Sequence, residues 1–307
     1  MKYLLLFISL IYAIPSNAQN KGVTLLILGT VQDGGSPHIG CQKECCAVLF
    51  DEPDPSRKVV SLGVIDHENQ RTYIFDASPD FTTQLKMVQE YTLPERKAPD
   101  GIFLTHAHIG HYTGLMYLGR EALGGKDVPV YAMPKMKLFL EKNGPWDQLV
   151  NLKNIELIEM TTDEKMQLTP NLTVIPFLVP HRGEYAETVG FKIIGSKKSA
   201  LFIPDIDKWY LWEKSIVEEL KKVDFAFLDA TFFDANEVNH RDVSEIPHPF
   251  VIESLELFKD LPENEKSKIH FIHLNHTNPL LDLESKASME VRSKGFQIAQ
   301  FSGTFKL

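Results

Sequence analysis

Three of the eleven histidines lie within six positions of one segment, THAHIGH: His106, His108 and His111. His106 and His108 are two residues apart, so in an extended segment their side chains point to the same side. His111 follows at the start of a predicted helix and can approach the same point from another direction. Imidazole is a good ligand for zinc, iron and manganese. A single histidine is more often an ordinary hydrogen-bonded residue, but this spacing after a strand favours a metal site.

Further along the chain, four more potential ligands stand at the ends of predicted strands. His181 ends LTVIPFLVPH, Asp205 follows ALFIP, and His273 and His276 lie in HFIHLNH. Side chains at one edge of a sheet can converge although they are distant in sequence. Zinc lowers the pKa of a bound water molecule to about 7, which yields hydroxide at neutral pH. These residues therefore predict a metal centre capable of hydrolysis.

The only cysteines, Cys41, Cys45 and Cys46, lie in one segment, HIGCQKECC. An odd and clustered set is a poor disulfide framework. With one histidine from HLNH, the three thiols would complete a tetrahedral Cys₃His zinc site. A disulfide or free buried thiols remain the alternative. We expect that a zinc here would tie the N-terminal loop to the last strands.

The elements that must position these residues are short strands and helices. Apolar runs over 23–30, 59–66 and 71–78 predict strands, and the second and third form a hairpin around the polar turn HENQ. GIFLTHAH predicts a strand that runs into the histidines, and 112–123 predicts a helix after them. Strands dominate the remainder, with helices between them and near the end. This pattern predicts an α/β or α+β layered domain of sheets covered by helices.

Composition and charge limit the class of protein. The chain has 307 residues, of which 43% are hydrophobic and 24% charged, enough for a sizeable core. The net charge of −9 argues against broad binding to nucleic acid or anionic membranes. Because no linker divides the chain, we expect a single domain over residues 19–307. A small-molecule substrate is the expected partner, and the sequence leaves the oligomeric state open.

The first residues, MKYLLLFISLIYAIPSNAQN, have the pattern of a secretory signal peptide. Lys2 provides the positive start, and the apolar run that follows is too short to span a bilayer. Ser16 and Ala18 are small residues that suit cleavage after Ala18. A membrane anchor or a buried helix is the alternative. We expect residues 1–18 to be removed and the protein to be periplasmic or secreted.

The histidine pattern resembles the metallo-β-lactamase-fold hydrolases, whose signature is His-x-His-x-Asp-His after a strand, followed by a distant His, an Asp and a last His. The matching residues, in the family's order, are His106, His108, His111, His181, Asp205 and His273. The resemblance implies an αββα sandwich with the metal site at one edge. A first metal would be held by His106, His108 and His181.

The same resemblance implies a second metal position formed by His111 and His273, with Asp205 bridging the two metals. Gly110 departs from the signature, because the family has there an aspartate that binds the second metal. The second position therefore keeps at most three of its usual ligands, and it is open whether one or two metals bind. Asp76 matches an early aspartate that steadies the histidines, and a turn-forming aspartate is the alternative.

Two subgroups of this fold resemble the chain in more detail. The cyclic-phosphate phosphodiesterase of phosphonate breakdown has an early cysteine cluster and a His-x-x-His pair after its last strand. By that resemblance His273 belongs to the active site and His276 to the structural zinc. VQDGGSPHIGC, DASPDFTTQL, IPDIDKW and FIHLNHTNPLL resemble the pyrroloquinoline-quinone biosynthesis protein B (PqqB-like) branch. That branch works inside the cell and is associated with iron-dependent hydroxylation.

His248 follows the strand end DATFF in a loop, as a histidine does in nuclease and phosphodiesterase members of the fold. The resemblance implies that it protonates the leaving oxygen as a general acid, and an ordinary loop histidine beside prolines is the alternative. We expect a hydrolase in which metal-bound hydroxide attacks a phosphodiester, ester or amide, with His248 and Asp205 as catalytic residues. An iron-dependent oxidative enzyme and a non-catalytic metal-binding protein are the alternatives.

Overall fold

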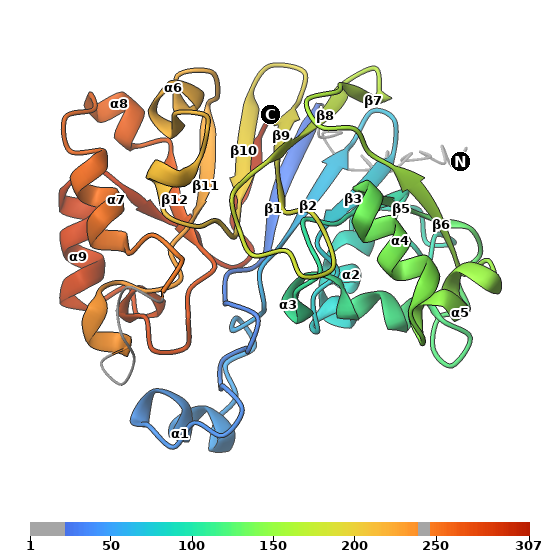
Figure 1. Cartoon of the computed structure of the whole chain (residues 1–307), viewed down its shortest axis with the longest axis horizontal. Helices are drawn as coiled ribbons and strands as arrows, with labels where there is room; N and C mark the ends of the chain where they lie inside the picture. The colour runs from blue at the N-terminus through green and yellow to red at the C-terminus, as the bar shows by residue number, and fades with distance from the viewer. Residues whose placement is uncertain (1–21, 239–245) are drawn as a thin grey trace, which may run out of the picture.

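The computed structural model describes residues 22–238 and 246–307, and two seven-stranded sheets make up most of this part of the chain (Figure 1). In spatial order, the first sheet consists of β14 (Thr304–Lys306), β1 (Val23–Gly29), β2 (Ser61–Asp66), β3 (Arg71–Phe75), β4 (Gly101–Phe103), β5 (Val128–Ala132) and β6 (Ile155–Glu159). The second consists of β13 (Gln297–Ile298), β12 (Ile269–Ile272), β11 (Phe225–Asp229), β10 (Ser199–Ile203), β9 (Val189–Ile194), β8 (Leu172–Leu178) and β7 (Met166–Thr169).

Helices cover the outer face of each sheet. The first sheet packs on α2 (Phe81–Gln89), α3 (Ile109–Tyr112), α4 (Pro134–Lys142) and α5 (Trp146–Asn151). The second packs on α6 (Ile216–Leu220), α7 (Val251–Leu257) and α9 (Lys286–Ser293), with α8 (Glu263–Lys266) nearby (Figure 1). A third apolar cluster joins the inner faces of the two sheets. The predicted αββα sandwich is therefore confirmed. No helix in the described part of the chain is long and apolar enough to cross a membrane.

The inner core is rich in stacked aromatic rings. Phe103 on β4 stacks between Phe75 on β3 and Tyr131 on β5, with ring centroids 4.8 and 4.2 Å away. Phe191 from the second sheet meets its edge at 5.7 Å. These rings lie on neighbouring strands in register, because Phe103 pairs with Phe75 and with Tyr131. Aromatic side chains on three adjacent strands of the first sheet therefore pack against the second sheet and hold the two sheets together.

Replacing Phe103 by alanine is expected to lower the free energy of unfolding by about 3–5 kcal/mol, the usual cost of emptying a buried aromatic site. Urea denaturation followed by circular dichroism would measure the change. Tyr117→Ala is the control, because that ring is 47% exposed and its loss leaves no cavity. A shift of the Phe103→Ala midpoint no larger than that of the control would contradict this account of the core.

One sequence prediction about secondary structure is wrong. The helix predicted over 112–123 is instead the single turn α3 followed by a 3₁₀ segment, Thr113–Leu118. Part of the backbone here bonds to the segment after β3 in place of a regular helical turn. The Gly114 N–H donates to the Ala77 carbonyl, and the Ala77 N–H donates to the His111 carbonyl, each at 2.9 Å. These tertiary hydrogen bonds hold His111 beside the end of β3 and prevent a longer helix.

Strand direction explains why the candidate residues meet. β3 and β4 are parallel to each other, as are β10, β11 and β12, so in each set the carboxyl ends lie at one edge. β1 is antiparallel to β2, which is antiparallel to β3, and β8 is antiparallel to β9, which is antiparallel to β10. β1 and β8 therefore run in the same direction as these parallel strands and end at the same edge. The segments that follow all seven strands therefore converge.

Candidate metal centre

The first group of candidate ligands comprises His106, His108, His181 and Asp205, whose nearest ligand atoms all lie within 4.8 Å of one another. His106 Nε2 lies 2.8 Å from His108 Nδ1 and 3.3 Å from Asp205 Oδ2. His181 Nε2 lies 3.3 Å from the other oxygen of Asp205. The structure thus brings together the four residues that the sequence assigns to the first metal and the bridge.

The second group comprises His111, His273 and Asp205, as expected, and also Asp33. Asp33 Oδ1 lies 2.9 Å from His111 Nε2 and 3.3 Å from His273 Nε2. The sequence analysis missed Asp33, because its segment, VQDGGSPHIGC, provided only a resemblance to the PqqB-like branch and no ligand of this metal position. The useful signal is that this loop directly follows β1, which ends at the same edge as β4. The structure thus places Asp33 beside the three usual ligands that the sequence analysis expected to remain at this position.

The other ring nitrogen of most of these histidines is already bonded, which orients the ligand nitrogen inward. Asp76 Oδ2 accepts from His111 Nδ1 at 2.7 Å, and Asp207 Oδ1 lies 2.9 Å from His181 Nδ1. The Thr231 hydroxyl lies 2.9 Å from His273 Nδ1. Asp76 therefore does more than form a turn. Asp76 and His273 have φ angles of 66° and 65°, a left-handed conformation that is uncommon for non-glycine residues and often occurs at functional sites.

Several of the converging atoms are buried without a well-aligned hydrogen bond among the described residues, although charged groups lie close to them. They are Nε2 of His108, His111 and His181 and Oδ1 of Asp205. An unsatisfied buried polar atom costs about 1–3 kcal/mol, so such atoms rarely cluster without a further group to bind. Imidazole and carboxylate together suit zinc, iron or manganese. The residues present therefore fit one or two metal ions.

Opposite charges compensate each other in this buried cluster. Burial would raise the pKa of Asp205, but His248 and His181 hold it well below its usual range. Burial would lower the pKa of His111, but the neighbouring Asp33 raises it well above its usual value. Protonated rings thus offset the carboxylates, which is the condition for burying so many charges. Metal binding would replace these protons.

His248 lies beside the first group and contacts two carboxylates. Its Nδ1 lies 2.8 Å from Asp229 Oδ2 and 3.1 Å from Asp205 Oδ1. Burial would lower the pKa of His248, but Asp229 and Asp205 raise it well above its usual value. The side chain is 14% exposed, so it is not sealed from solvent. Asp229, the last residue of β11, is a second contributor that the sequence analysis missed.

The cysteines form a separate cluster at the base of α1 (Glu44–Asp51), which protrudes below the sandwich in Figure 1. Candidate ligand atoms of Cys41, Cys45, Cys46 and His276 all lie within 4.8 Å of one another. The Sγ atoms of Cys45 and Cys46 are 4.0 Å apart, and all three thiols are free. Burial and the nearby ring of His38 lower the pKa of His276 to about 4. Its ring is therefore neutral at pH 7, the form that binds metal.

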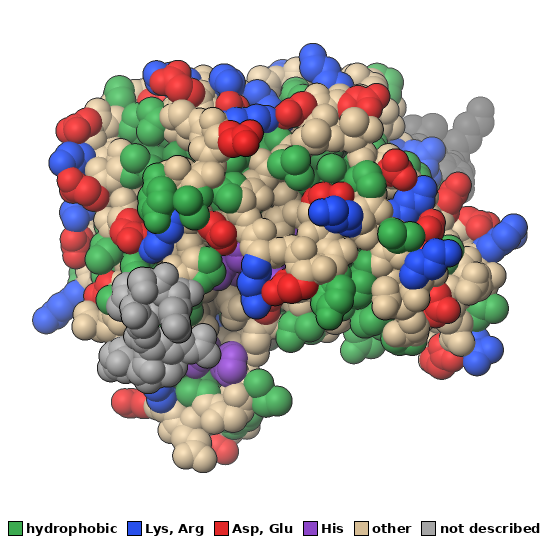
Figure 2. All heavy atoms as spheres, in the orientation of Figure 1, with side chains coloured by type: hydrophobic (Ala, Val, Ile, Leu, Met, Phe, Trp, Pro, Cys, Tyr) green, Lys and Arg blue, Asp and Glu red, His purple; other side chains and the backbone are tan. Residues whose placement is uncertain are grey.

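Exposed charged side chains lie at the rim of the histidine cluster. Glu184 Oε2 is 3.5 Å from His108 Nε2, and Glu184 Oε1 is 3.5 Å from Arg182 Nη1. The side chains of Arg182 and Glu184 are 66% and 52% exposed, so this pair contributes little to stability. Figure 2 shows histidine side chains near the middle of the face, partly covered by neighbouring side chains. His181, one of the candidate ligands, also lines a surface pocket of about 540 Å³.

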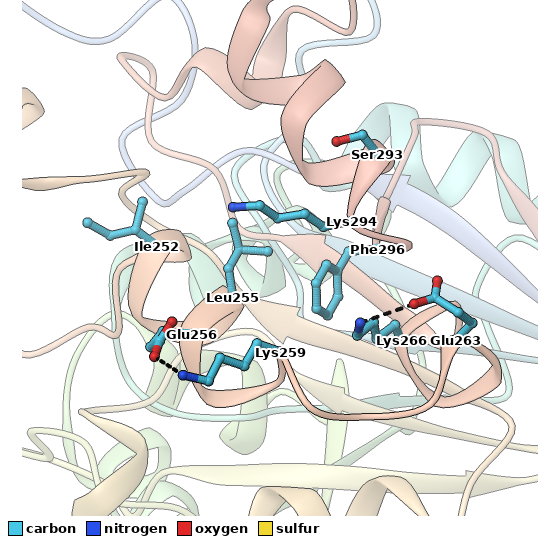
Figure 3. A pocket seen from close by; sticks show the side chains of 9 residues that line it. All are labelled: Ile252, Leu255, Glu256, Lys259, Glu263, Lys266, Ser293, Lys294 and Phe296. Carbon is cyan, nitrogen blue, oxygen red and sulfur yellow. Dashed lines mark hydrogen bonds and ion pairs between the residues drawn. The ribbon is translucent and has the colours of Figure 1, made fainter.

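A separate surface pocket of about 510 Å³ lies among α7, α8 and α9 (Figure 3). None of the candidate metal ligands lines it. Two of its three lysines are paired within the pocket, Lys259 with Glu256 at 2.5 Å and Lys266 with Glu263 at 3.1 Å. These pairs satisfy the charges locally, so the pocket adds nothing to the chemistry of the metal centre.

The model of the beta-lactamase superfamily domain matches residues 71–271, about two thirds of the chain. The match includes most of the candidate metal ligands and follows the order of the signature. The chain therefore belongs to the beta-lactamase superfamily, and its metallo-β-lactamase fold places the two ligand groups at the edge where that fold implies metal sites.

Within the superfamily, the chain is similar to coenzyme PQQ synthesis protein B from Methylorubrum extorquens (strain PA1). The two are 24% identical, and the alignment covers 92% of this chain and 99% of the relative. The crystal structure of Zn(2+)-bound PqqB from Methylobacterium extorquens has the same fold, with a TM-score of 0.73 and 21% identity over 92% of this chain and all of the other. A diphosphatase from the PhnP family gives a TM-score of 0.62 at 23% identity, covering 93% of this chain and 97% of that one.

The comparison contradicts the predicted periplasmic or secreted location. Relatives that match nine-tenths of the chain are coenzyme PQQ synthesis proteins, the branch whose resemblance implies a location inside the cell. The prediction depended on residues 1–18 and cleavage after Ala18, which lie outside the described residues. An apolar run after a lysine is a pattern of composition, and composition alone does not determine location.

Proposed function

We propose that this protein is a metal-dependent hydrolase that acts on a phosphodiester, ester or amide substrate. The observation that carries the proposal is the pair of ligand groups that share Asp205 and direct unpartnered buried nitrogens toward common points. Zinc is the metal we favour, because histidine nitrogens predominate in the first group. When bound, it would supply a Lewis acid and an activated water molecule.

The chain's own residues would position the substrate and move the proton. His248 would donate a proton to the leaving oxygen from Nε2, because its Nδ1 is engaged by Asp229 and Asp205. Asp229 would act as a positioning residue, since it contacts His248 and also accepts hydrogen bonds from the Thr231 N–H and hydroxyl at 2.9 and 2.7 Å. Arg182 at the rim is the cation nearest to the ligand His181 in sequence and would meet an anionic substrate group.

Replacing His248 by glutamine is expected to lower kcat by about 10²–10⁴-fold on a phosphodiester with a poor leaving group. A 4-nitrophenyl ester, whose leaving group needs no proton, would lose much less. The metal content should equal that of the wild type. His67→Gln is a matched control, because His67 lies in the β2–β3 turn, where it contacts Thr24. Equal losses on both substrates would contradict the assignment of His248 as general acid.

The second candidate function is an oxidative reaction that uses iron at the same centre. The sequence likeness to coenzyme PQQ synthesis protein B over 92% of the chain favours it. The two proposals differ in their need for oxygen, because hydrolysis proceeds without it. Turnover measured in anaerobic buffer with zinc-loaded and iron-loaded protein would separate them. Activity retained without oxygen supports hydrolysis, and activity that requires both iron and oxygen supports the oxidative function.

We also propose that Cys41, Cys45, Cys46 and His276 hold a structural zinc. Three thiols and one imidazole whose ligand atoms lie within 4.8 Å of one another suit a closed tetrahedral site. The neutral ring of His276 and the compact set of free thiols support this assignment. The zinc would attach α1 to the segment after β12, where the core of the sandwich does not reach.

A further inference from the structure

Asp33 fills the space into which a side chain at position 110 would point. A β-carbon added to Gly110 would lie 2.3 Å from Asp33 Oδ1 and 2.7 Å from its Cα. Real β-carbons essentially never come so close to another atom. Any side chain at position 110 therefore requires Asp33 to move. The glycine in the histidine motif is the residue that makes room for this carboxylate.

Asp33 also has the surroundings of a metal ligand. Its side chain is 13% exposed, and the same oxygen, Oδ1, is the atom nearest to both His111 Nε2 and His273 Nε2. His111 Nε2 is buried and has no well-aligned hydrogen bond within the described ranges. Both nitrogens are also within 3.9 Å of Asp205 Oδ2. Two carboxylates and two imidazoles thus enclose one point.

The backbone holds Asp33 firmly at this point. The Gln32 N–H donates to the Leu274 carbonyl at 2.9 Å, one residue after His273 in the chain. The Gly34 N–H donates to the side chain of Gln32 at 3.2 Å, and Gly35 has a φ of 75° that allows the chain to turn away. Asp33 is therefore placed by the same backbone pairing that places His273.

We propose that Asp33 is a ligand of the second metal and replaces the aspartate that the histidine motif lacks at position 110. The carboxylate ligand then comes from the loop after β1 and not from the histidine motif. The second metal position therefore has four ligands: Asp33, His111, Asp205 and His273. This inference rests on the metal-dependent function proposed above. The alternative is that Asp33 only forms an ion pair with His111.

Asp33→Asn keeps the size of the side chain and removes its charge. After loading with zinc and removal of excess, metal content by plasma mass spectrometry is expected to fall by about one equivalent per chain. Affinity for Co²⁺ at this position, followed by its visible absorption, is expected to fall about 10–100-fold or more, since even residues behind the ligands have effects of that size. Asp66→Asn, a buried carboxylate at the opposite end of β2, is the matched control.

Two further variants test whether a carboxylate at position 33 and one at position 110 can replace each other as the metal ligand. Gly110→Asp alone is expected to gain no metal and to melt at a lower temperature, because its side chain meets Asp33. The double variant Asp33→Gly, Gly110→Asp is expected to regain metal relative to Asp33→Asn. Unchanged zinc content and Co²⁺ affinity in Asp33→Asn would overturn the inference while leaving the proposed function intact. A wild-type protein that binds no metal beyond the cysteine cluster would overturn the proposed function itself.

Discussion

Asp205→Asn is expected to lower metal affinity at the histidine centre by at least about a hundredfold and hydrolytic activity by a similar or larger factor. Asp205 is 3% exposed. Among the described residues, it alone belongs to both ligand groups, and it also contacts His248. Removing its charge therefore affects both metal positions and leaves several positive rings without their common partner. Mass spectrometry of metal content and a phosphodiester assay would measure the two losses.

Two controls separate a specific effect from general destabilisation. Asp66→Asn also changes a buried carboxylate, but at the far edge of the first sheet, and is expected to keep full metal content. Asp207→Asn removes a group that contacts only His181 in the centre and is expected to have an intermediate effect. If Asp205→Asn retained two metals at wild-type affinity, the bridging role would be refuted.

Cys46→Ser is expected to remove one zinc and to lower the melting temperature by roughly 5–10 °C, the shift that about 3 kcal/mol produces in a domain of this size. Cys46 is fully buried, and its sulfur accepts the His38 N–H at 3.2 Å. Serine is too short and too hard a ligand to replace the thiolate. Differential scanning calorimetry together with zinc analysis would measure the effect.

The metal dependence of this shift is the decisive comparison. A chelator also strips the histidine centre, so the wild type and Cys46→Ser are each compared with and without it. The chelator is expected to lower the melting temperature of the wild type more than that of the variant, which has already lost the zinc of the cysteine cluster. Equal destabilisation of the variant in the presence and in the absence of zinc would show that Cys46 acts through packing and not through a metal.

Local patterns in the sequence predict much of the fold. The apolar runs correspond to β1, β2 and β3, and the polar HENQ turn joins β2 to β3. These patterns predict sheets covered by helices, whereas the αββα order of the layers was implied by the family resemblance. The helix after the histidines was wrong because its hydrogen bonds are made to Ala77, a partner that no periodicity reveals. Tertiary hydrogen bonds can override a helical pattern wherever a short segment passes close to another strand.

In the candidate site, too, local sequence patterns predict some residues, while others are defined only by tertiary contacts. Histidines spaced two and three apart indicate a metal site by themselves, whereas Asp33 has no recognisable spacing from any of them. Its place depends on the direction of β1 and on pairing with Leu274, both of which are properties of the folded chain. Asp229 was missed for a related reason, because a carboxylate that orients another side chain is defined only by contact.

The segment Thr30–Gln32 hydrogen-bonds to both sheets at once. Val31 exchanges backbone bonds with Lys58 and Val60 on one side, while Thr30 and Gln32 bond to Leu274 on the other. Asp33 and His273 both adjoin this seam, and the cysteine cluster lies just beyond it. The ligands that come from the two sheets can therefore move apart only when this stretch of backbone pairing breaks. One short segment thus fixes the distance between the two halves of the ligand set.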